Sequence, residues 1–293
     1  MKIFITGGSG LLGQYLNIEL SKHYTILTQH HLNPGNCYEF NNIRLDLTDS
    51  FSLKDVFSDF KPDIVIHTAA ISNPQMAEKI DSKIVYAVNV KATEHLTQLC
   101  EIHNTKLIYT STDLVYAGYR GSMLKEDAKL IPISLYAETK LMGEVKIEET
   151  LDNYIILRTA LLYGFGLNHL TNHFQQMYQN LKDGKEVKLF TDQYRTPLSV
   201  IDAARMINEL IQKDIKSEIL NFGGIERVSR YELGEILCMV AGFDKNLLVK
   251  INMDDLPGLT KVEDVSMNTD KLQSYGIKST SISASIKNIL NEC

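Results

Sequence analysis

The sequence predicts an α/β protein with a doubly wound parallel sheet and a smaller, discontinuous C-terminal α/β lobe. Two features of the 293 residues support this fold class. Short runs rich in Ile, Val and Leu, without alternating polar residues, are typical of strands that are buried on both faces of a parallel sheet. Between these runs, apolar residues recur at three- and four-residue spacing, which indicates helices that cover the sheet.

The expected elements follow one another along the first part of the chain. We predict strands over residues 2–6, 24–28, 43–45, 63–68, 106–109 and 154–158. We predict helices over residues 11–21, 50–60, 77–103 and 134–150, the third of which is open to division into two. A late strand is expected at residues 218–223. These elements divide the chain into a first domain, residues 1–165, and a second lobe, residues 166–293, with a segment near residues 199–223 that returns to the first domain.

Composition and charge exclude several classes of protein. Hydrophobic residues make up 44% and charged residues 23%, which is ordinary globular usage. A net charge of -6 gives no electrostatic attraction for nucleic acid or for an anionic membrane. Because no segment is long and apolar enough for a transmembrane helix or a signal peptide, we expect a cytoplasmic protein. The widely separated cysteines indicate reduced thiols, and no residue cluster suggests a metal site: Cys37, Cys100, Cys238 and Cys293.

Glycines at three-residue intervals separate the first expected strand from the first expected helix. Gly7 and Gly10 permit a tight turn and the close approach of a pyrophosphate, and Gly13 lets the helix pack closely on the strand. The backbone N–H groups at the start of the helix, around Leu11 and Leu12, are free to bind an anion. This pattern predicts a Rossmann-type dinucleotide site, and the alternative is a turn with a purely structural role.

The end of the second expected strand indicates which dinucleotide binds. NAD-binding proteins commonly place an acidic residue there to bind the ribose hydroxyls. This chain instead reads Gln29, His30 and His31. These polar groups, cationic when protonated, tolerate a ribose phosphate better than a carboxylate would, so NADP(H) is favoured over NAD(H) and His30 is a candidate contact. The alternative is a pair of solvated histidines in an exposed loop.

A tyrosine and a lysine stand four residues apart, on one face of the helix expected at residues 134–150. Tyr136 and Lys140 follow a strand that leads into Thr112, and strand ends are where open sheets bind ligands. A lysine that favours the phenolate would lower the tyrosine pKa from its usual value of about 10 and make it a usable acid or base. Tyr178 and Lys182 have the same spacing without this context. The alternative is an amphipathic surface helix.

Taken together, these residues resemble the extended short-chain dehydrogenase/reductase family over nearly the whole chain. Three further motifs carry the resemblance, each near an expected strand or helix: Asp46-Leu47-Thr48-Asp49, His67-Thr68-Ala69-Ala70 and Val88-Asn89-Val90. The resemblance assigns Asp46, with Leu47 beside it, to the adenine. It assigns Ala69 and Ala70 to the cofactor channel and Asn89 to support of the cofactor and active site.

Within that family the chain looks most like the dTDP-4-dehydrorhamnose reductase branch. The run 111–116, Ser-Thr-Asp-Leu-Val-Tyr, carries a threonine in place of the commoner catalytic serine, and residues 192–197 and 265–272 are similar to the branch's substrate-domain signatures. Methionine adenosyltransferase regulatory subunits share these features. Two residues depart from the pattern: Gln75 replaces an expected acidic residue and Lys261 an expected arginine. The resemblance therefore leaves the identity of the nucleotide sugar open.

The resemblance implies that a nicotinamide transfers hydride to C4 of a nucleotide-linked 4-keto-6-deoxy sugar. Tyr136 would donate a proton to the carbonyl oxygen, Lys140 would hold the nicotinamide ribose, and Thr112 would orient the ketone. The expected substrate contacts lie at the cleft between the lobes: Asp113, Asn172 and Arg195. An epimerase that recycles its cofactor and a non-catalytic NADP-binding regulatory subunit remain alternatives. A homodimer is an expectation from the family.

Overall fold

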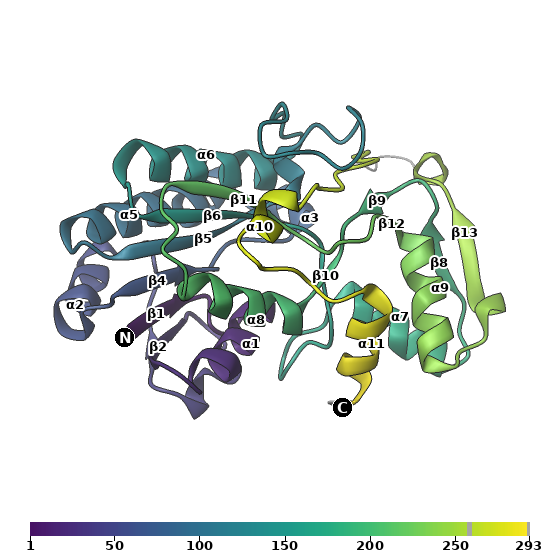
Figure 1. The fold of residues 1–293 in the computed structure, drawn as a ribbon, viewed down its shortest axis with the longest axis horizontal. Helices are drawn as coiled ribbons and strands as arrows, with labels where there is room; N and C mark the ends of the chain where they lie inside the picture. Colours follow the sequence, from purple (N-terminus) through teal and green to yellow (C-terminus); the bar gives the residue numbers. More distant parts are fainter. Residues whose placement is uncertain (257–259, 292–293) are drawn as a thin grey trace.

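A computed structural model describes residues 1–256 and 260–291 of the chain. Its centre is a seven-stranded sheet with the strand order β11-β6-β5-β4-β1-β2-β3, in which every neighbouring pair is parallel (Figure 1). The strands are β1 Lys2–Thr6, β2 Thr25–His30, β3 Asn42–Arg44, β4 Ile64–His67, β5 Lys106–Thr112, β6 Tyr154–Thr159 and β11 Glu218–Phe222. The order reverses at β1, so the chain winds in both directions from the centre, as predicted.

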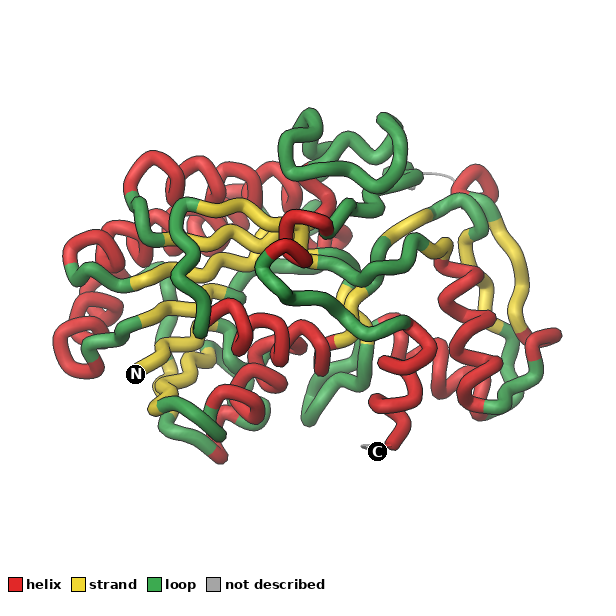
Figure 2. Tube along the Cα trace, viewed as in Figure 1, coloured by secondary structure: helices red, strands yellow, loops and turns green. Residues whose placement is uncertain are grey.

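Helices cover both faces of this sheet (Figures 1 and 2). One face carries α1 Leu11–Leu20 and α8 Val200–Ile211; the other carries α2 Ser50–Phe60, α5 Ala92–Ile102 and α6 Leu135–Thr150. Successive residues of β1 enter opposite cores: Ile3 and Ile5 pack in the core of α1 and α8, and Phe4 packs in the core of α2 and α5. Burial on both faces explains why these strands are apolar without alternation.

The edge strand β11 comes from the second half of the sequence. It pairs in parallel with β6, from Glu218 opposite Ile155 to Phe222 opposite Thr159. The preceding helix α8 packs beside α1 on the same face of the sheet. The strand expected at residues 218–223 is therefore present, and it adds the last strand to the sheet after an excursion into the second lobe.

The second lobe has its own apolar core. Its elements are α7 His173–Lys182, α9 Arg230–Ala241 and α11 Ile282–Asn291 with the strand pair β8 Val187–Phe190 and β13 Leu248–Ile251. Two short strand pairs join this lobe to the sheet region: β7 Leu162–Tyr163 with β10 Leu198–Ser199, and β9 Tyr194–Arg195 with β12 Val228–Ser229. A short helix, α10 Asp270–Ser274, returns to the sheet edge and contacts β11.

Two sequence expectations need correction. The segment 77–103 is divided, as the prediction left open, but at other bounds: α3 Pro74–Ala77 lies mostly before it, and α4 Ser82–Tyr86, the π-helical turn η2 Ala87–Lys91 and α5 follow one another without a gap. The division arises because Asn73 and Asp81 each accept backbone hydrogen bonds as caps and start new helices. The histidine pair is also not a loop: β2 extends to His30, which is buried, and only His31 is exposed.

The described residues bear on three further expectations. Cys37, Cys100 and Cys238 are buried free thiols, and Cys293 lies outside the described residues. Over residues 1–256 and 260–291, no helix is long and apolar enough to cross a membrane. In the same ranges, no group of His, Cys, Asp and Glu has an arrangement that could hold a metal ion.

Candidate active site

A cavity of 1590 Å³ opens at the carboxyl ends of the central strands and extends to the second lobe. Most of the predicted site residues line it: Gly7, Gly10, Leu11, Leu12, Gly13, His30, Asp46, Leu47, Ala69, Ala70, Thr112, Asp113, Tyr136, Lys140 and Arg195. Asn89 and Asn172 do not line it. The topology thus brings together residues that are more than 180 positions apart in the sequence.

The glycine loop forms one end of the cavity. A side chain at Gly13 would place its Cβ 2.1 Å from the Gly7 carbonyl oxygen, and Gly7 has a φ of +67° with the backbone of Ala69 only 2.6 Å from a Cβ. Helix α1 begins after Gly10 without a side-chain cap, so the N–H groups of its first turn remain available. An uncapped helix start beside a loop that excludes side chains fits the pyrophosphate of a dinucleotide.

The end of β2 forms the part of the cavity wall beside the glycine loop, and it carries no free carboxylate. Gln29 is fully engaged, because its side chain accepts a hydrogen bond from Gly7 N at 2.8 Å and donates one to the Leu45 carbonyl at 2.6 Å. His30 lines the cavity, and its buried Nδ1 has no hydrogen-bond partner. Asp46 accepts hydrogen bonds from Thr48, and its other oxygen lies 3.9 Å from His31.

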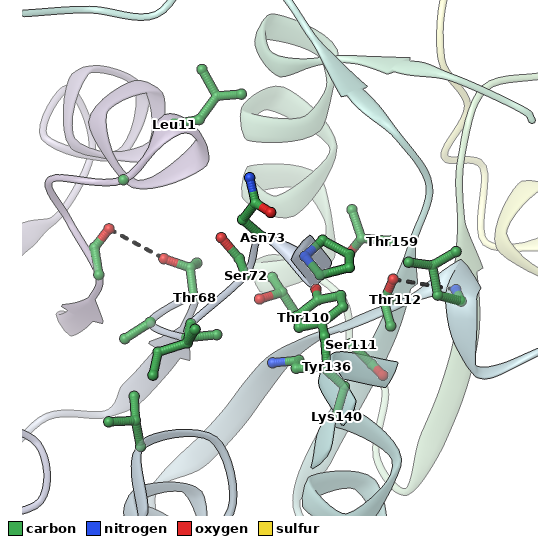
Figure 3. Close-up of a pocket in the computed structure, with 18 of the residues that line it drawn as sticks. Leu11, Thr68, Ser72, Asn73, Thr110, Ser111, Thr112, Tyr136, Lys140 and Thr159 are labelled. Carbon is green, nitrogen blue, oxygen red and sulfur yellow. Dashed lines mark hydrogen bonds between the residues drawn. The ribbon is translucent and has the colours of Figure 1, made fainter. Parts of the chain in front are cut away.

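Tyr136, Lys140 and Thr112 meet in the middle of the cavity (Figure 3). Tyr136 and Lys140 stand one turn apart on α6, whose N-terminus is capped by Ser134. Thr112 is the last residue of β5, which extends beyond the expected strand end and so brings the hydroxyl to the edge of the sheet. The Thr112 hydroxyl donates to Asp113 Oδ1 at 3.3 Å and accepts a hydrogen bond from Leu114 N at 3.2 Å. Because Thr112 and Tyr136 line the same part of the cavity, the hydroxyl and the phenol can contact one substrate oxygen.

The electrostatics of this group differ from the sequence expectation. Burial raises the pKa of Tyr136 to about 12, partly opposed by the nearby Thr112 hydroxyl and reinforced by the charge of Asp113. Burial also lowers the pKa of Lys140 to about 7, opposed by Glu144. The expected lowering of the tyrosine pKa by the lysine is absent, because both groups are buried and burial disfavours both charged forms. Tyr136 therefore holds its proton at neutral pH.

Asn89 lies behind the cavity instead of on its surface. Its side chain accepts a hydrogen bond from Ile71 N at 2.8 Å and donates one to the Thr139 hydroxyl at 3.0 Å. It occupies the π-helical turn η2, a distortion that is often found at functional sites. Asn89 thus connects the loop after β4 to α6 and does not touch the cavity as a cofactor contact would.

A buried charged cluster forms the other end of the cavity. Asp113 is 4% exposed, and its Oδ2 lies 3.8 Å from Arg195 Nε without a hydrogen bond. Arg230, the first residue of α9, donates from Nε to Gln193, while its buried Nη1 has no partner. Burial and repulsion by Arg195 lower the pKa of Arg230 to about 10. The buried guanidinium of Arg195, the half-buried one of Arg230 and one carboxylate leave a net positive charge.

Some predicted residues lie elsewhere, and some lining residues were missed. Asn172 caps α7 by accepting a hydrogen bond from Gln175 N and donates to the Gly164 carbonyl, so both ends of its amide are engaged within the second lobe. The pair Tyr178 and Lys182, which has the same four-residue spacing as Tyr136 and Lys140, lies on α7 outside the cavity wall. Arg230 was missed because its sequence surroundings carry no motif. Its one available signal was Ser229 with Glu232, a capping box that marks a helix start.

Comparison with known proteins identifies the family. The family model described as RmlD substrate binding domain matches residues 1–293. The chain belongs to this family. The predicted resemblance to the dTDP-4-dehydrorhamnose reductase branch of the extended short-chain dehydrogenases/reductases is thereby confirmed, as is the predicted class of NAD(P)-dependent oxidoreductase.

Individual relatives of the family match along most of their length. A dTDP-4-dehydrorhamnose reductase of Aggregatibacter actinomycetemcomitans is 26% identical over 307 residues, covering 98% of each chain. Methionine adenosyltransferase 2 subunit beta of Xenopus laevis is 26% identical over 284 residues, covering 94% of this chain and 83% of its own. A dTDP-4-dehydrorhamnose reductase of Bacillus anthracis, solved in complex with NADP, has a TM-score of 0.87 and 24% identity, covering 100% and 99% of the two chains. The predicted Rossmann-type fold class is confirmed.

Proposed function

We propose that the protein reduces the 4-keto group of a 6-deoxy sugar linked to a nucleoside diphosphate, with NAD(P)H as the hydride donor and Tyr136 as the proton donor. One observation carries the proposal. Thr112, Tyr136 and Lys140 meet midway along a single cavity, with a dinucleotide-type glycine loop at one end and Arg195 and Arg230 at the other. The family comparisons support the same class of substrate.

A bound reduced nicotinamide supplies the hydride to C4. As this carbon becomes tetrahedral, the carbonyl oxygen gains negative charge and takes the proton of Tyr136. The pKa of about 12 suits this role, because the phenol is protonated before the reaction. The Thr112 hydroxyl orients the ketone by a neutral hydrogen bond. The protonated Lys140 would hold the cofactor ribose.

The charged end of the cavity suits the diphosphate of the substrate. Arg195 and Arg230 supply fixed planar donors, and the unpartnered Nη1 of Arg230 is a ready donor to an anionic oxygen. Asp113, next to Thr112, has a pKa raised by burial and a free oxygen that can accept a hydrogen bond from a sugar hydroxyl. The sugar would then lie against Thr112 and Tyr136, with its diphosphate toward the second lobe.

The proposed cofactor preference is NADP(H) over NAD(H). Since Gln29 is occupied by backbone groups, no carboxylate stands at the end of β2 to select the ribose hydroxyls. His30, with its unpartnered Nδ1, is the proposed contact of the ribose phosphate.

Substituting His30→Asp should raise the NADPH KM about tenfold with little change in the NADH KM. A carboxylate here repels the ribose phosphate, and the loss corresponds to about one charge-assisted hydrogen bond. Steady-state kinetics with both cofactors would measure the ratio. His30→Gln is the matched control, because it keeps a polar side chain without a negative charge. An unchanged ratio in His30→Asp would show that the ribose phosphate binds elsewhere.

The function itself is tested by the absorbance of NADPH or NADH when purified protein is mixed with nucleotide-linked 4-keto-6-deoxyhexoses. We expect loss of the reduced-nicotinamide absorbance with at least one of these sugars. Demonstrated cofactor binding without any such loss would contradict the reductase proposal. It would instead favour an epimerase that regenerates its cofactor or a regulatory binding subunit.

A further inference from the structure

The catalytic helix carries a third polar residue on the face of Tyr136 and Lys140. Glu144 follows Lys140 by four positions, as Lys140 follows Tyr136, so the three lie in one row along α6. Glu144 is 1% exposed and does not line the cavity. A carboxylate is seldom buried so completely without partners that compensate its charge. Glu144 takes no direct part in the proposed hydride and proton transfers.

The partners of Glu144 come from the two strands beneath the helix. Arg158 on β6 donates to the carboxylate from Nη2 at 2.9 Å and from Nε at 3.2 Å. Ser111 on β5 donates its hydroxyl to the other oxygen. Ser111 directly precedes Thr112, so this carboxylate connects α6 to the strand that ends in the substrate-orienting threonine.

The Arg158 guanidinium is in turn fully engaged. Its Nη1 donates to the Tyr116 hydroxyl at 3.1 Å and to the Glu126 carbonyl at 2.8 Å. The Tyr116 hydroxyl donates to Asn221 on β11 at 2.6 Å. The ion pair therefore has hydrogen-bond partners on both sides, which is the condition under which a buried pair keeps both charges in place.

Glu144 also contributes to the electrostatic environment of Lys140. The titratable groups that face Lys140 come from three elements: Glu144 and Tyr136 on α6, Tyr109 on β5, whose ring centroid lies 4.0 Å from Nζ, and His67 on β4. Burial and the nearby lysine lower the pKa of His67 to about 3, so this histidine is neutral. Among the described residues, Glu144 is the group whose charge favours the protonated form of Lys140 against burial.

We propose that Glu144 is a positioning residue of the reductase: with Arg158 and Ser111 it fixes the catalytic helix on β5 and β6 and keeps Lys140 charged for contact with the cofactor. The role rests on the proposed function, in which Lys140 holds the nicotinamide ribose. Glu144 acts through Lys140 and does not contact the substrate.

The experiment measures the NADPH dissociation constant as a function of pH, from the fluorescence of the reduced nicotinamide. In the wild-type protein, Lys140 is charged below pH 7 and neutral well above it, so affinity should decline as the pH rises through about 7. In Lys140→Met this decline should disappear, which assigns it to Lys140. In Glu144→Gln the onset should move down by about one pH unit, because the favourable charge is lost.

A double variant separates the charge of Glu144 from the unpaired arginine that Glu144→Gln leaves behind. Glu144→Gln/Arg158→Met has no buried orphan charge, and it too should show the lowered onset. Glu149→Gln, an exposed glutamate on the same helix paired with Lys146, is the matched control and should behave as wild type. A wild-type onset in the double variant, or in a folded Glu144→Gln protein, would overturn the proposal.

This measurement requires no sugar substrate, so it distinguishes two failures. If the protein binds NADPH but reduces no nucleotide sugar, the proposed function fails while the pH onset still tests the role of Glu144. If reduction is observed and the onset does not depend on Glu144, the positioning role alone is wrong.

Discussion

Substituting Tyr136→Phe should lower kcat by about 10²- to 10⁴-fold while NADPH binding stays close to wild type. The change removes the hydroxyl that donates the proton and retains the ring, which is 9% exposed and packs in a small apolar cluster with Val85 and Ala77. The fold should therefore persist. Steady-state turnover of a nucleotide-linked 4-keto sugar gives kcat, and nicotinamide fluorescence gives the cofactor affinity.

The chain provides a matched control for this substitution. Tyr178 stands four residues before Lys182 on α7, with the same spacing as Tyr136 and Lys140 but outside the cavity. Tyr178→Phe removes the same hydroxyl and should leave kcat unchanged. Full turnover in Tyr136→Phe would contradict every catalytic assignment made here, because no other hydroxyl on α6 is placed to protonate the ketone in the described part of the chain.

The sequence predicted those parts of the site that depend on local geometry. The glycine loop could be identified from the sequence because Gly7 and Gly13 lie close to each other when a tight turn joins the strand to the helix. Tyr136 and Lys140 could be paired because a four-residue interval places two residues on one helix face. The central strands could be placed because burial on both faces imposes a continuous apolar run.

Other parts of the site depend on contacts that no local pattern encodes. Arg230 reaches the cavity because β12 pairs with β9, which sets the start of α9 beside Gln193. Glu144 finds Arg158 only through the packing of α6 on β6. The predicted lowering of the Tyr136 pKa by Lys140 was wrong for the same reason. The four-residue spacing correctly placed Lys140 beside Tyr136, but the shift depends on how deeply both are buried, which is a property of the whole fold.

Substituting Arg230→Met should raise the KM for the nucleotide sugar about 10- to 100-fold, with kcat and NADPH affinity little changed. The magnitude corresponds to one charge-assisted hydrogen bond, about 1.5–3 kcal/mol, lost equally from bound substrate and transition state. The free protein should not be destabilised. Burial and repulsion by Arg195 already lower the pKa of Arg230 to about 10, so removing this cation relieves an unfavourable interaction that offsets the loss of its hydrogen bond to Gln193.

The direction of the change in melting temperature distinguishes a substrate contact from a residue that stabilises the second lobe. A residue that held the lobe together would lower the melting temperature when replaced, whereas Arg230→Met should leave it equal or raise it. Arg227 is the matched control: it stacks on Tyr194 and pairs with Asp264 at 2.7 Å outside the catalytic cavity. Arg227→Met should therefore leave the KM unchanged. An unchanged KM in Arg230→Met would place the diphosphate elsewhere, and Arg195, which already donates to the Tyr194 carbonyl, would then have to bind it.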